Sequence, residues 1–275
     1  MQWMVRLLTL CAGILLAFGL AAMPQSATSP ATNSKKVRIA AEDNWPPFSD
    51  ERGQGLSKQL VQAALAASGY KIETIAMPYA RALHETAQGD VDGCWNVTRQ
   101  QSTLDQYLLH QTPLFQARAS YYYHGKVRPY RSVADIPNNT VVGVILGYEY
   151  GDLYEQHKQR FKLVEVSTHG QLIQLLDAGK LDLAIFFDDV LAYYLHQPEF
   201  QQVKLLRGHT NHVSDIFVAF TKNQARSVEL ATALDRGLAE LKRSGTYQRL
   251  LEQYLAKPSV ERASVEQPTA VPTQE

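Results

Sequence analysis

One kind of segment occurs twice in this chain and constrains its fold more than any other feature. The copies span residues 82–93 and 172–184, and in each an apolar-striped helix is followed by Gly, a charged residue, an aliphatic residue, Asp and a run suited to a buried strand. A further strand-like run precedes each copy, at 72–76 and 163–166. Glycine suits the left-handed residue that ends a helix. Two such units predict two similar α/β lobes with a crevice that can hold a small molecule.

Strand-like and helix-like segments alternate along most of the chain. An opening strand at 37–41 leads through a turn with two prolines to an amphipathic helix at 55–69 and the first copy of the repeat. A second series starts at residue 140, and a strand at 216–220 with two further helices follows it. This alternation is typical of doubly wound sheets. We predict an α/β fold with two lobes, each with a doubly wound sheet, joined by a two-strand hinge.

The order of the segments indicates how the lobes share the chain. About 220 residues lie between a flexible leader and a polar tail, enough for two lobes of roughly 100 residues each. Because the last strand and helices come after the second lobe, two crossings between the lobes are expected, near 120–124 and 212–220. The predicted order is a signal peptide at 1–27, lobe 1 at 36–120, lobe 2 at 125–209, the return to lobe 1 at 212–257 and a disordered tail at 258–275.

The N-terminal segment predicts export. Arg6 is followed by an apolar stretch at 7–22 and then by small residues and a proline, as in a cleaved secretory signal peptide. Cys11 follows Leu10 where a lipoprotein signal requires a small residue, which argues against a lipid anchor. We therefore expect a periplasmic protein. Its remaining cysteine, Cys94, cannot form an internal disulfide and is predicted to be a small core residue.

Composition and motifs exclude several classes of function. The 27 basic residues balance 27 acidic ones without a basic block, which excludes nucleic acid as an expected partner. The chain has no Gly-X-Ser-X-Gly or His-Glu-X-X-His motif and no Cys–His pair with a recognisable spacing. Its eight histidines are scattered without metal-ligand spacing. We expect a binding protein that is not an enzyme and needs no metal or other cofactor.

Several motifs also follow one another in a familiar order. They are the Trp-Pro-Pro-Phe turn at 45–48, the Gly-x-aliphatic-Asp run at 88–92, Thr-Pro-Leu at 112–114, the glycine- and tyrosine-containing segment at 143–151 and the closing helices at 238–254. With them the chain resembles, over about residues 36 to 257, the periplasmic solute-binding proteins of polar amino-acid ABC transporters, family 3. The resemblance implies a monomer of the periplasmic-binding-protein fold that closes its two lobes over a small polar solute and delivers it to an ABC permease in the inner membrane.

The carboxyl ends of the predicted strands indicate where a ligand binds. In open α/β sheets ligands lie beyond these ends, which selects residues 42–48, 77–81, 94–99, 146–150 and 187–189. Aromatic side chains there either stack on a ligand or fill the core, and an arginine in the first turn of a helix either pairs with an anion or is solvated. The candidate ligand-binding residues are Asp43, Trp45, Phe48, Arg81, Trp95, Asn96, Thr98, Arg99, Tyr148, Glu149 and Asp188.

The resemblance assigns a carboxylate anchor that this chain lacks at the usual position. In the family a Thr is followed three residues later by an Arg that holds the α-carboxylate of the ligand through two hydrogen bonds. Here Thr98 matches the Thr, but Gln101 stands in place of the Arg, and Arg99 lies next to the Thr instead. Either Arg99 or Arg81 has taken over this role, or the ligand has no α-carboxylate.

The second family anchor is an Asp that follows the strand of lobe 2 and binds the α-amino group. Its expected position holds Phe187, and Asp188 comes next, so a one-residue bulge would restore the anchor. The alternative is that Asp188 caps the following helix. Tyr148 and Glu149 occupy the loop of lobe 2 that meets the ligand in the family, at a helix start whose free amides can also hold an anion.

Two alternative functions remain compatible with the sequence. The protein can present its ligand to a signalling receptor instead of a permease. It can also be a dehydratase or hydrolase on the same scaffold, with Glu42, Asp43 and Glu149 as the acids, although the sequence shows no partner for proton transfer.

Overall fold

The computed structural model describes residues 35–255. The predicted signal peptide at 1–27 and the predicted tail at 258–275 lie outside these residues. Within the described part of the chain, no helix is both long and apolar enough to span a membrane.

Strands and helices alternate, as the sequence predicts. The first series consists of β1 (Lys35–Glu42), α1 (Leu56–Ala66), β2 (Tyr70–Met77), α2 (Tyr79–Gln88), β3 (Gly93–Thr98), α3 (Gln101–Gln106), β4 (Tyr107–Leu109) and β5 (Phe115–His124). The second consists of β6 (Val141–Ile145), α4 (Asp152–His157), β7 (Lys162–Val166), α5 (His169–Asp177), β8 (Leu183–Phe187) and α6 (Asp188–Leu195). The last elements are β9 (Leu205–Thr221), α7 (Ala225–Arg243) and α8 (Thr246–Leu255).

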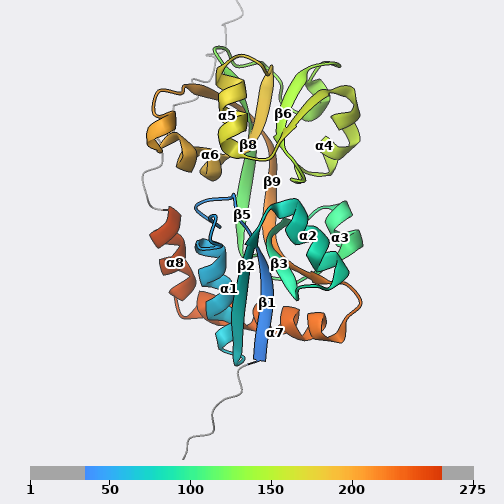
Figure 1. The fold of residues 1–275 in the computed structure, drawn as a ribbon, viewed down its shortest axis with the longest axis vertical. Helices are drawn as coiled ribbons and strands as arrows, with labels where there is room; N and C mark the ends of the chain where they lie inside the picture. Colours follow the sequence, from blue (N-terminus) through green and yellow to red (C-terminus); the bar gives the residue numbers. More distant parts are fainter. Residues whose placement is uncertain (1–34, 256–275) are drawn as a thin grey trace, which may run out of the picture. The chain divides into compact units, whose positions relative to one another are not determined.

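The internal repeat is visible in the strand order. Backbone hydrogen bonds order the strands as β2-β1-β3-β9-β5-β8-β6-β7, with β4 paired to β9. In lobe 1, β1 pairs in parallel with β2 and β3, and in lobe 2, β6 pairs in parallel with β7 and β8 (Figure 1). The two halves therefore have the same arrangement, with an antiparallel strand added next to β3 and next to β8. The predicted two-lobed α/β fold is confirmed.

The lobes are joined by two long neighbouring strands. β5 pairs with β8 of lobe 2 from Ala119 onward, and β9 pairs with β3 of lobe 1 from Ile216 onward. Between these points, residues 116–118 and 213–215 pair only with each other. Because both strands run through without interruption, hydrogen bonding connects the two predicted sheets into one nine-stranded sheet. Residues 116–118 and 213–215 are called the crossing below.

Helices α1 and α7 pack closely against one face of the lobe 1 sheet. Gly237 lies where the helices approach most closely: a Cβ atom added there would be 2.1 Å from the backbone oxygen of Ala64. The helices bury an apolar seam between them and the sheet, so this part of the core depends on a residue without a side chain. The buried residues of the two helices include Leu56, Leu60, Val61, Ala64, Leu65, Leu230, Leu234, Leu238 and Leu241.

The aspartate of the repeat has the same role in both lobes. After α2 the chain turns at Gly89 in the left-handed conformation, with φ at 81°, and the carboxylate of Asp92 accepts a hydrogen bond of 2.7 Å from the backbone amide of Arg38 in β1. In lobe 2 the carboxylate of Asp182 accepts one of 2.8 Å from the amide of Val141 in β6. Each aspartate thus extends the hydrogen bonding between two parallel strands beyond the last ladder bond, which explains why the motif recurs.

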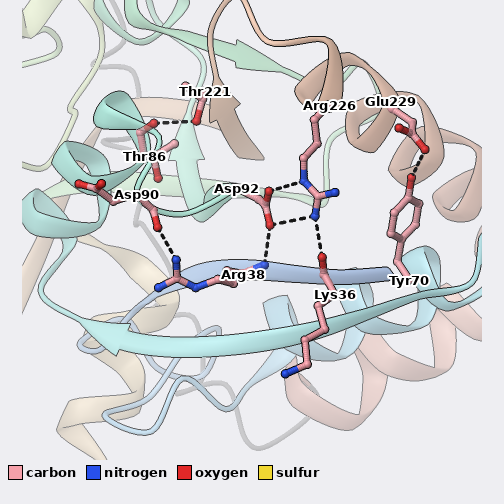
Figure 2. Close-up of polar contacts among 9 residues, drawn as sticks. All are labelled: Lys36, Arg38, Tyr70, Thr86, Asp90, Asp92, Thr221, Arg226 and Glu229. Atoms are coloured by element: carbon pink, nitrogen blue, oxygen red, sulfur yellow. Dashed lines mark hydrogen bonds and ion pairs between the residues drawn. The ribbon is translucent and has the colours of Figure 1, made fainter. Parts of the chain in front are cut away.

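Lobe 1 adds an ion pair to this arrangement. Arg226 of α7 donates to Asp92 at 2.5 Å and to the carbonyl oxygen of Lys36 at 2.6 Å (Figure 2). Tyr70 and Glu229 form a further hydrogen bond between β2 and α7 in the same region. Asp92 therefore connects β1, the start of β3 and α7.

The two aspartates provide a matched comparison. We expect Asp92→Ala to lower the free energy of unfolding by about 2–3 kcal/mol, since it removes charge-assisted hydrogen bonds to Arg226 and to the amide of Arg38. Asp182→Ala removes one bond at an exposed position and should cost about 1 kcal/mol or less. Urea unfolding of both variants, with unchanged m-values, measures the difference. Equal losses would contradict the role assigned to the ion pair with α7.

Candidate functional site

A small cavity lies between the two lobes. Its volume is about 10 Å³, roughly the space for one water-sized group. Lobe 1 contributes five lining residues and lobe 2 contributes three. They are Glu42, Trp45, Tyr79, Asn96 and Thr98 from lobe 1, and Tyr148, Glu149 and Phe187 from lobe 2.

The ends of the strands position these side chains. Glu42 is the last residue of β1, Tyr79 begins α2 directly after β2, and Phe187 is the last residue of β8. Tyr148 and Glu149 lie in the loop between β6 and α4. The cavity thus lies at the carboxyl ends of the parallel strands in both lobes, as the sequence analysis predicts for this fold.

A β-bulge directs Asn96 toward Glu42. The pairing between β3 and β9 shifts register between Trp95 and Val97, and Asn96 has a positive φ of 70°. Bulges of this kind redirect a side chain and occur often beside binding sites. The Asn96 amide donates a hydrogen bond of 3.1 Å to the Glu42 carboxylate, and its oxygen accepts one of 2.5 Å from the hydroxyl of Ser57.

Glu42 is a buried carboxylate that contacts the opposite lobe. The hydroxyl of Tyr148 hydrogen-bonds to it from lobe 2 and also lies 3.3 Å from the backbone oxygen of Asn44. Burial raises the pKa of Glu42 to about 8, although the hydrogen bonds from Tyr148 and Asn96 oppose this effect.

Glu149 makes the reciprocal contact from lobe 2. Its carboxylate accepts a hydrogen bond of 2.7 Å from the hydroxyl of Tyr79 and lies 3.4 Å from the hydroxyl of Thr98, both in lobe 1. Burial raises the pKa of Glu149 to about 8 as well, against the effect of the same two hydrogen bonds. Each lobe therefore supplies one carboxylate and one phenol to the closed cleft.

Further polar contacts hold the lobes together around the cavity. The side chain of Asn44 accepts a hydrogen bond of 2.6 Å from the hydroxyl of Tyr194 in α6. On the other side, the amide of Gly151 donates to the side chain of Gln100 at 3.1 Å, and the amide of Gln101 donates to Asp152 at 3.0 Å. Gln101, which stands where the resemblance implies an arginine, thus contacts lobe 2 through its backbone.

Aromatic rings form the apolar part of the wall. Trp45 is held in a tight turn by reciprocal backbone hydrogen bonds of 2.9 Å with Ser49. Its ring meets Phe187 edge-on at 5.0 Å between centroids and lies 4.7 Å from Phe48. Tyr79 and Tyr148 meet edge-on at 5.4 Å across the cleft. Phe48 packs behind Trp45 in the core and is not among the lining residues.

Several candidates from the sequence lie elsewhere. The guanidinium of Arg99 lies 5.2 Å from the ring centroid of Phe217, and Arg81 is exposed and paired with Glu85 of the same helix at 3.0 Å. Trp95 is fully buried and donates to the hydroxyl of Ser49 at 3.1 Å. None of these three lines the cavity, and neither does the partly exposed Asp43.

Asp188 also lies outside the lining. It begins α6, accepts a hydrogen bond of 3.1 Å from Tyr122 and pairs with Arg207 at 2.9 Å. The pairing of β5 with β8 has no bulge, so Phe187 and not Asp188 faces the cavity. Among the predicted candidates the structure therefore brings together Trp45, Asn96, Thr98, Tyr148 and Glu149.

Tyr79 was not among the predicted site residues, and Glu42 was considered only as an enzymatic acid. Both could have been found from position alone, because Glu42 ends the first strand and Tyr79 follows the proline that starts α2. Among the described residues, no cluster of three or more His, Cys, Asp or Glu side chains is suited to hold a metal ion.

A larger groove adjoins the loop that carries Tyr148 and Glu149. It has a volume of about 220 Å³, enough for a small organic group, and it shares these two residues with the cavity. Its lining includes Gln100, Ser102, Ile145, Tyr150, Tyr154, Glu155, Lys158 and Glu165. Lys158, the basic residue in this lining, is paired with Glu155 at 2.6 Å.

Comparison with known proteins identifies the family of this chain. The family model of bacterial extracellular solute-binding proteins, family 3, matches residues 37–257. The chain belongs to this family. The match spans both lobes and the closing helices, as the sequence resemblance implies. Among curated protein sequences, none matches significantly.

Solved structures share the fold at low sequence identity. An amino-acid ABC transporter substrate-binding protein from Streptococcus pneumoniae, bound to L-arginine, has a TM-score of 0.66 and 23% identity and covers 80% of this chain and 94% of its own. A histidine kinase sensor domain has a TM-score of 0.68 and 17% identity over 80% and 96% of the two chains. The ancestral amino-acid-binding protein AncCDT-1, a precursor of cyclohexadienyl dehydratase, has a TM-score of 0.64 and 18% identity over 80% and 95%.

Proposed function

We propose that this protein binds a small polar solute in the periplasm by closing its two lobes, and that it delivers the solute to an ABC permease. The observation that carries this proposal is the reciprocal contact across the cleft: Glu42 of lobe 1 meets Tyr148 of lobe 2, and Glu149 of lobe 2 meets Tyr79 of lobe 1. A site assembled from both lobes is complete only when they close, so binding and closure are coupled. The family membership and the substrate-binding protein from S. pneumoniae support the transport role.

The crossing supplies the mechanism for closure. At 116–118 and 213–215 the two strands form ladder pairs only with each other, and the amide of Arg99 in lobe 1 donates to the carbonyl oxygen of Asp215 at 3.3 Å, so bending there disturbs few backbone hydrogen bonds of the lobes. Small changes in backbone dihedral angles at such positions move whole lobes as rigid bodies. Side chains of the two lobes already touch at the site, which supports a closed arrangement.

Closure can be measured by small-angle scattering. We expect a solute identified by thermal shift to reduce the radius of gyration of the protein at pH 8.5, with the scattering of the bound protein fitting the closed structure. A double variant, Tyr79→Phe with Tyr148→Phe, lacks the phenolic hydrogen bonds across the cleft. It should show less compaction than the parent protein at equal saturation with solute. A radius of gyration unchanged by every solute that binds would contradict the proposal.

A dehydratase or related small-molecule enzyme is the second candidate. The observation that favours it is the pair of buried carboxyl groups with a pKa of about 8, a property of general acids, together with the similarity to a dehydratase precursor. Chemical analysis of the solute after prolonged incubation distinguishes the candidates. Recovery of the unchanged solute supports binding, whereas conversion that is lost in Glu42→Gln or Glu149→Gln supports the enzyme.

A further inference from the structure

We propose that the cavity between the lobes recognises the positively charged group of an organic cation, such as an ammonium group, between the carboxylates of Glu42 and Glu149. This inference rests on the proposed function and names the class of solute. A site that holds the carboxylate of an amino acid needs positively charged groups, whereas the charged groups that face this cavity are two glutamates.

The charges around the cavity are the first observation. Its eight lining residues include two glutamates and no Lys, Arg or His. The two arginines predicted as carboxylate anchors are engaged elsewhere, Arg99 over Phe217 and Arg81 with Glu85. His169 lies 3.4 Å from the hydroxyl of Tyr148, but burial lowers its pKa to about 3 and it stays neutral. A ligand carboxylate here would meet two carboxylates and no cation.

The polarity of the hydrogen bonds is the second observation. The amide of Asn96 can only donate to Glu42, and the hydroxyl of Tyr148 reaches the same carboxylate. Tyr79 and Thr98 are hydroxyl donors to Glu149. Carboxylates that receive bonds from donors are arranged for the ionised form. Without a cation, burial opposes these donors and raises the pKa of both carboxyl groups to about 8. A positively charged group between them offsets the cost of burying two ionised carboxylates.

Aromatic residues around the same space are the third observation. Four aromatic residues from separate segments of the chain line the cavity: Trp45, Tyr79, Tyr148 and Phe187. Rings bind cations through their negative faces, and cages of several rings are a common means of recognising alkylammonium groups. Two carboxylates and four rings therefore suit an ammonium group, the carboxylates through their charge and the rings through cation–π attraction.

The size of the cavity fits the same group. A volume of about 10 Å³ accommodates one water-sized group, such as a primary ammonium group. The adjoining groove of about 220 Å³ shares Tyr148 and Glu149 with the cavity, so it offers space for the remainder of a longer molecule. Lys158 of that groove is paired with Glu155, so Glu149 and Glu165 leave its lining acidic.

Calorimetry with solutes of defined charge tests the inference. The panel consists of choline, putrescine and agmatine as cations without a carboxylate, L-arginine and L-glutamine as amino acids, and L-glutamate as an anion. We expect at least one of the three cations to bind. Because protons and the cation compete for the same carboxylates, its affinity should increase as pH rises from 6 to 8. The other titratable groups around the two glutamates are Asp43, Tyr79, Cys94, Tyr107, Tyr148, Tyr150, Tyr194 and His169. Of these, the tyrosines, Cys94 and His169 stay neutral over that range.

Isosteric variants identify the groups that hold the cation. Glu42→Gln and Glu149→Gln keep the shape of the side chain and remove its charge, and each should weaken binding of the cation by roughly thirty-fold to several thousand-fold. Glu51→Gln, at an exposed glutamate of lobe 1 outside the cavity, is the control and should leave affinity unchanged. Circular dichroism of all three variants checks that they remain folded.

The possible outcomes separate this inference from the proposed function. If only L-glutamate or an amino acid binds, and Arg99→Ala or Arg81→Ala weakens binding by thirty-fold or more, the cation inference is overturned and the proposed function stands. An affinity that falls as pH rises from 6 to 8 would also overturn the inference. If no solute of any charge in a broad library binds or compacts the protein, the proposed function fails, and the inference fails with it.

Discussion

Gly237→Ala is expected to lower the free energy of unfolding by about 3 kcal/mol, one of the largest effects available from a single methyl group in this protein. The added Cβ would lie 2.1 Å from the backbone oxygen of Ala64 and 2.5 Å from its carbonyl carbon. Both atoms belong to the backbone of α1 and cannot rotate away. Helices α1 and α7 must therefore move apart, which loosens the buried seam of leucines between them and the sheet.

Urea unfolding measures this effect. Ala239→Ser is a matched control, because it adds one atom to the same helix at an exposed position and should change stability by no more than about 0.5 kcal/mol. The contact lies within lobe 1 and away from the lining of the cavity, so the folded fraction of Gly237→Ala should still bind solute. A loss below about 1 kcal/mol would show that the helices separate easily and that the close approach contributes little.

The closed form without solute is expected to open as pH rises. Burial in the closed cleft raises the pKa of Glu42 and of Glu149 from 4.5 to about 8. When the lobes separate, both carboxyl groups become solvated and regain ordinary pKa values. The closed form therefore binds protons more tightly than the open form, so closure is most favourable below about pH 4.5 and loses this contribution as pH rises through 8. Each linked proton changes the ratio of closed to open molecules by up to about tenfold per pH unit.

The fluorescence of Trp45 reports this equilibrium. In the closed form the centroid of its ring lies 5.0 Å from that of Phe187 in the opposite lobe, whereas Trp95 is buried within lobe 1. We expect a cooperative change in emission and an increase in the radius of gyration between pH 6 and 9. The Trp45→Phe variant should lose the change in emission and keep the change in size.

A double variant provides the decisive comparison. Glu42→Gln combined with Glu149→Gln keeps the side-chain shapes and removes both titrating groups, so its lobes should stay closed across the same pH range. A parent protein whose size and emission do not change between pH 6 and 9, or a double variant that still opens, would contradict the linkage between these carboxyls and closure.

The fold could be predicted from the sequence because its signals are local. In each lobe a glycine ends a helix and an aspartate stands three residues later, just before a strand. This short spacing is visible in the sequence, although the strand that the aspartate bonds lies 54 or 41 positions earlier. The length of β9 could not be predicted. Residues 205–215 have no apolar alternation, and they form a strand because β5 lies beside them. Tertiary pairing overrides local preference there.

The location of the cavity could be predicted in outline, and the alternation of side chains along the strands decides which residues line it. The carboxyl ends of the strands selected the segments that line the cavity, but neighbouring residues in a strand point to opposite faces. Thr98 faces the cavity, so Arg99, the next residue, faces Phe217 instead. The bulge at Asn96 has no clear sequence signal, since it depends on the register with β9. The meeting of Glu42 and Tyr148 depends on how two lobes close, which no local pattern encodes.

The route of the chain through the crossing determines the order in which the protein can be completed during synthesis. One edge of β3 pairs with β1, which is synthesised before it. The other edge pairs with residues 216–220, which are synthesised only after the whole of lobe 2. The strands β6, β7 and β8 and the part of β9 that pairs with β5 in lobe 2 all precede them. Lobe 2 can therefore finish its sheet while lobe 1, begun first, still has an unpaired edge that can associate with other chains. A nascent chain of this design is exposed to aggregation through its N-terminal lobe for as long as its C-terminal segment is missing.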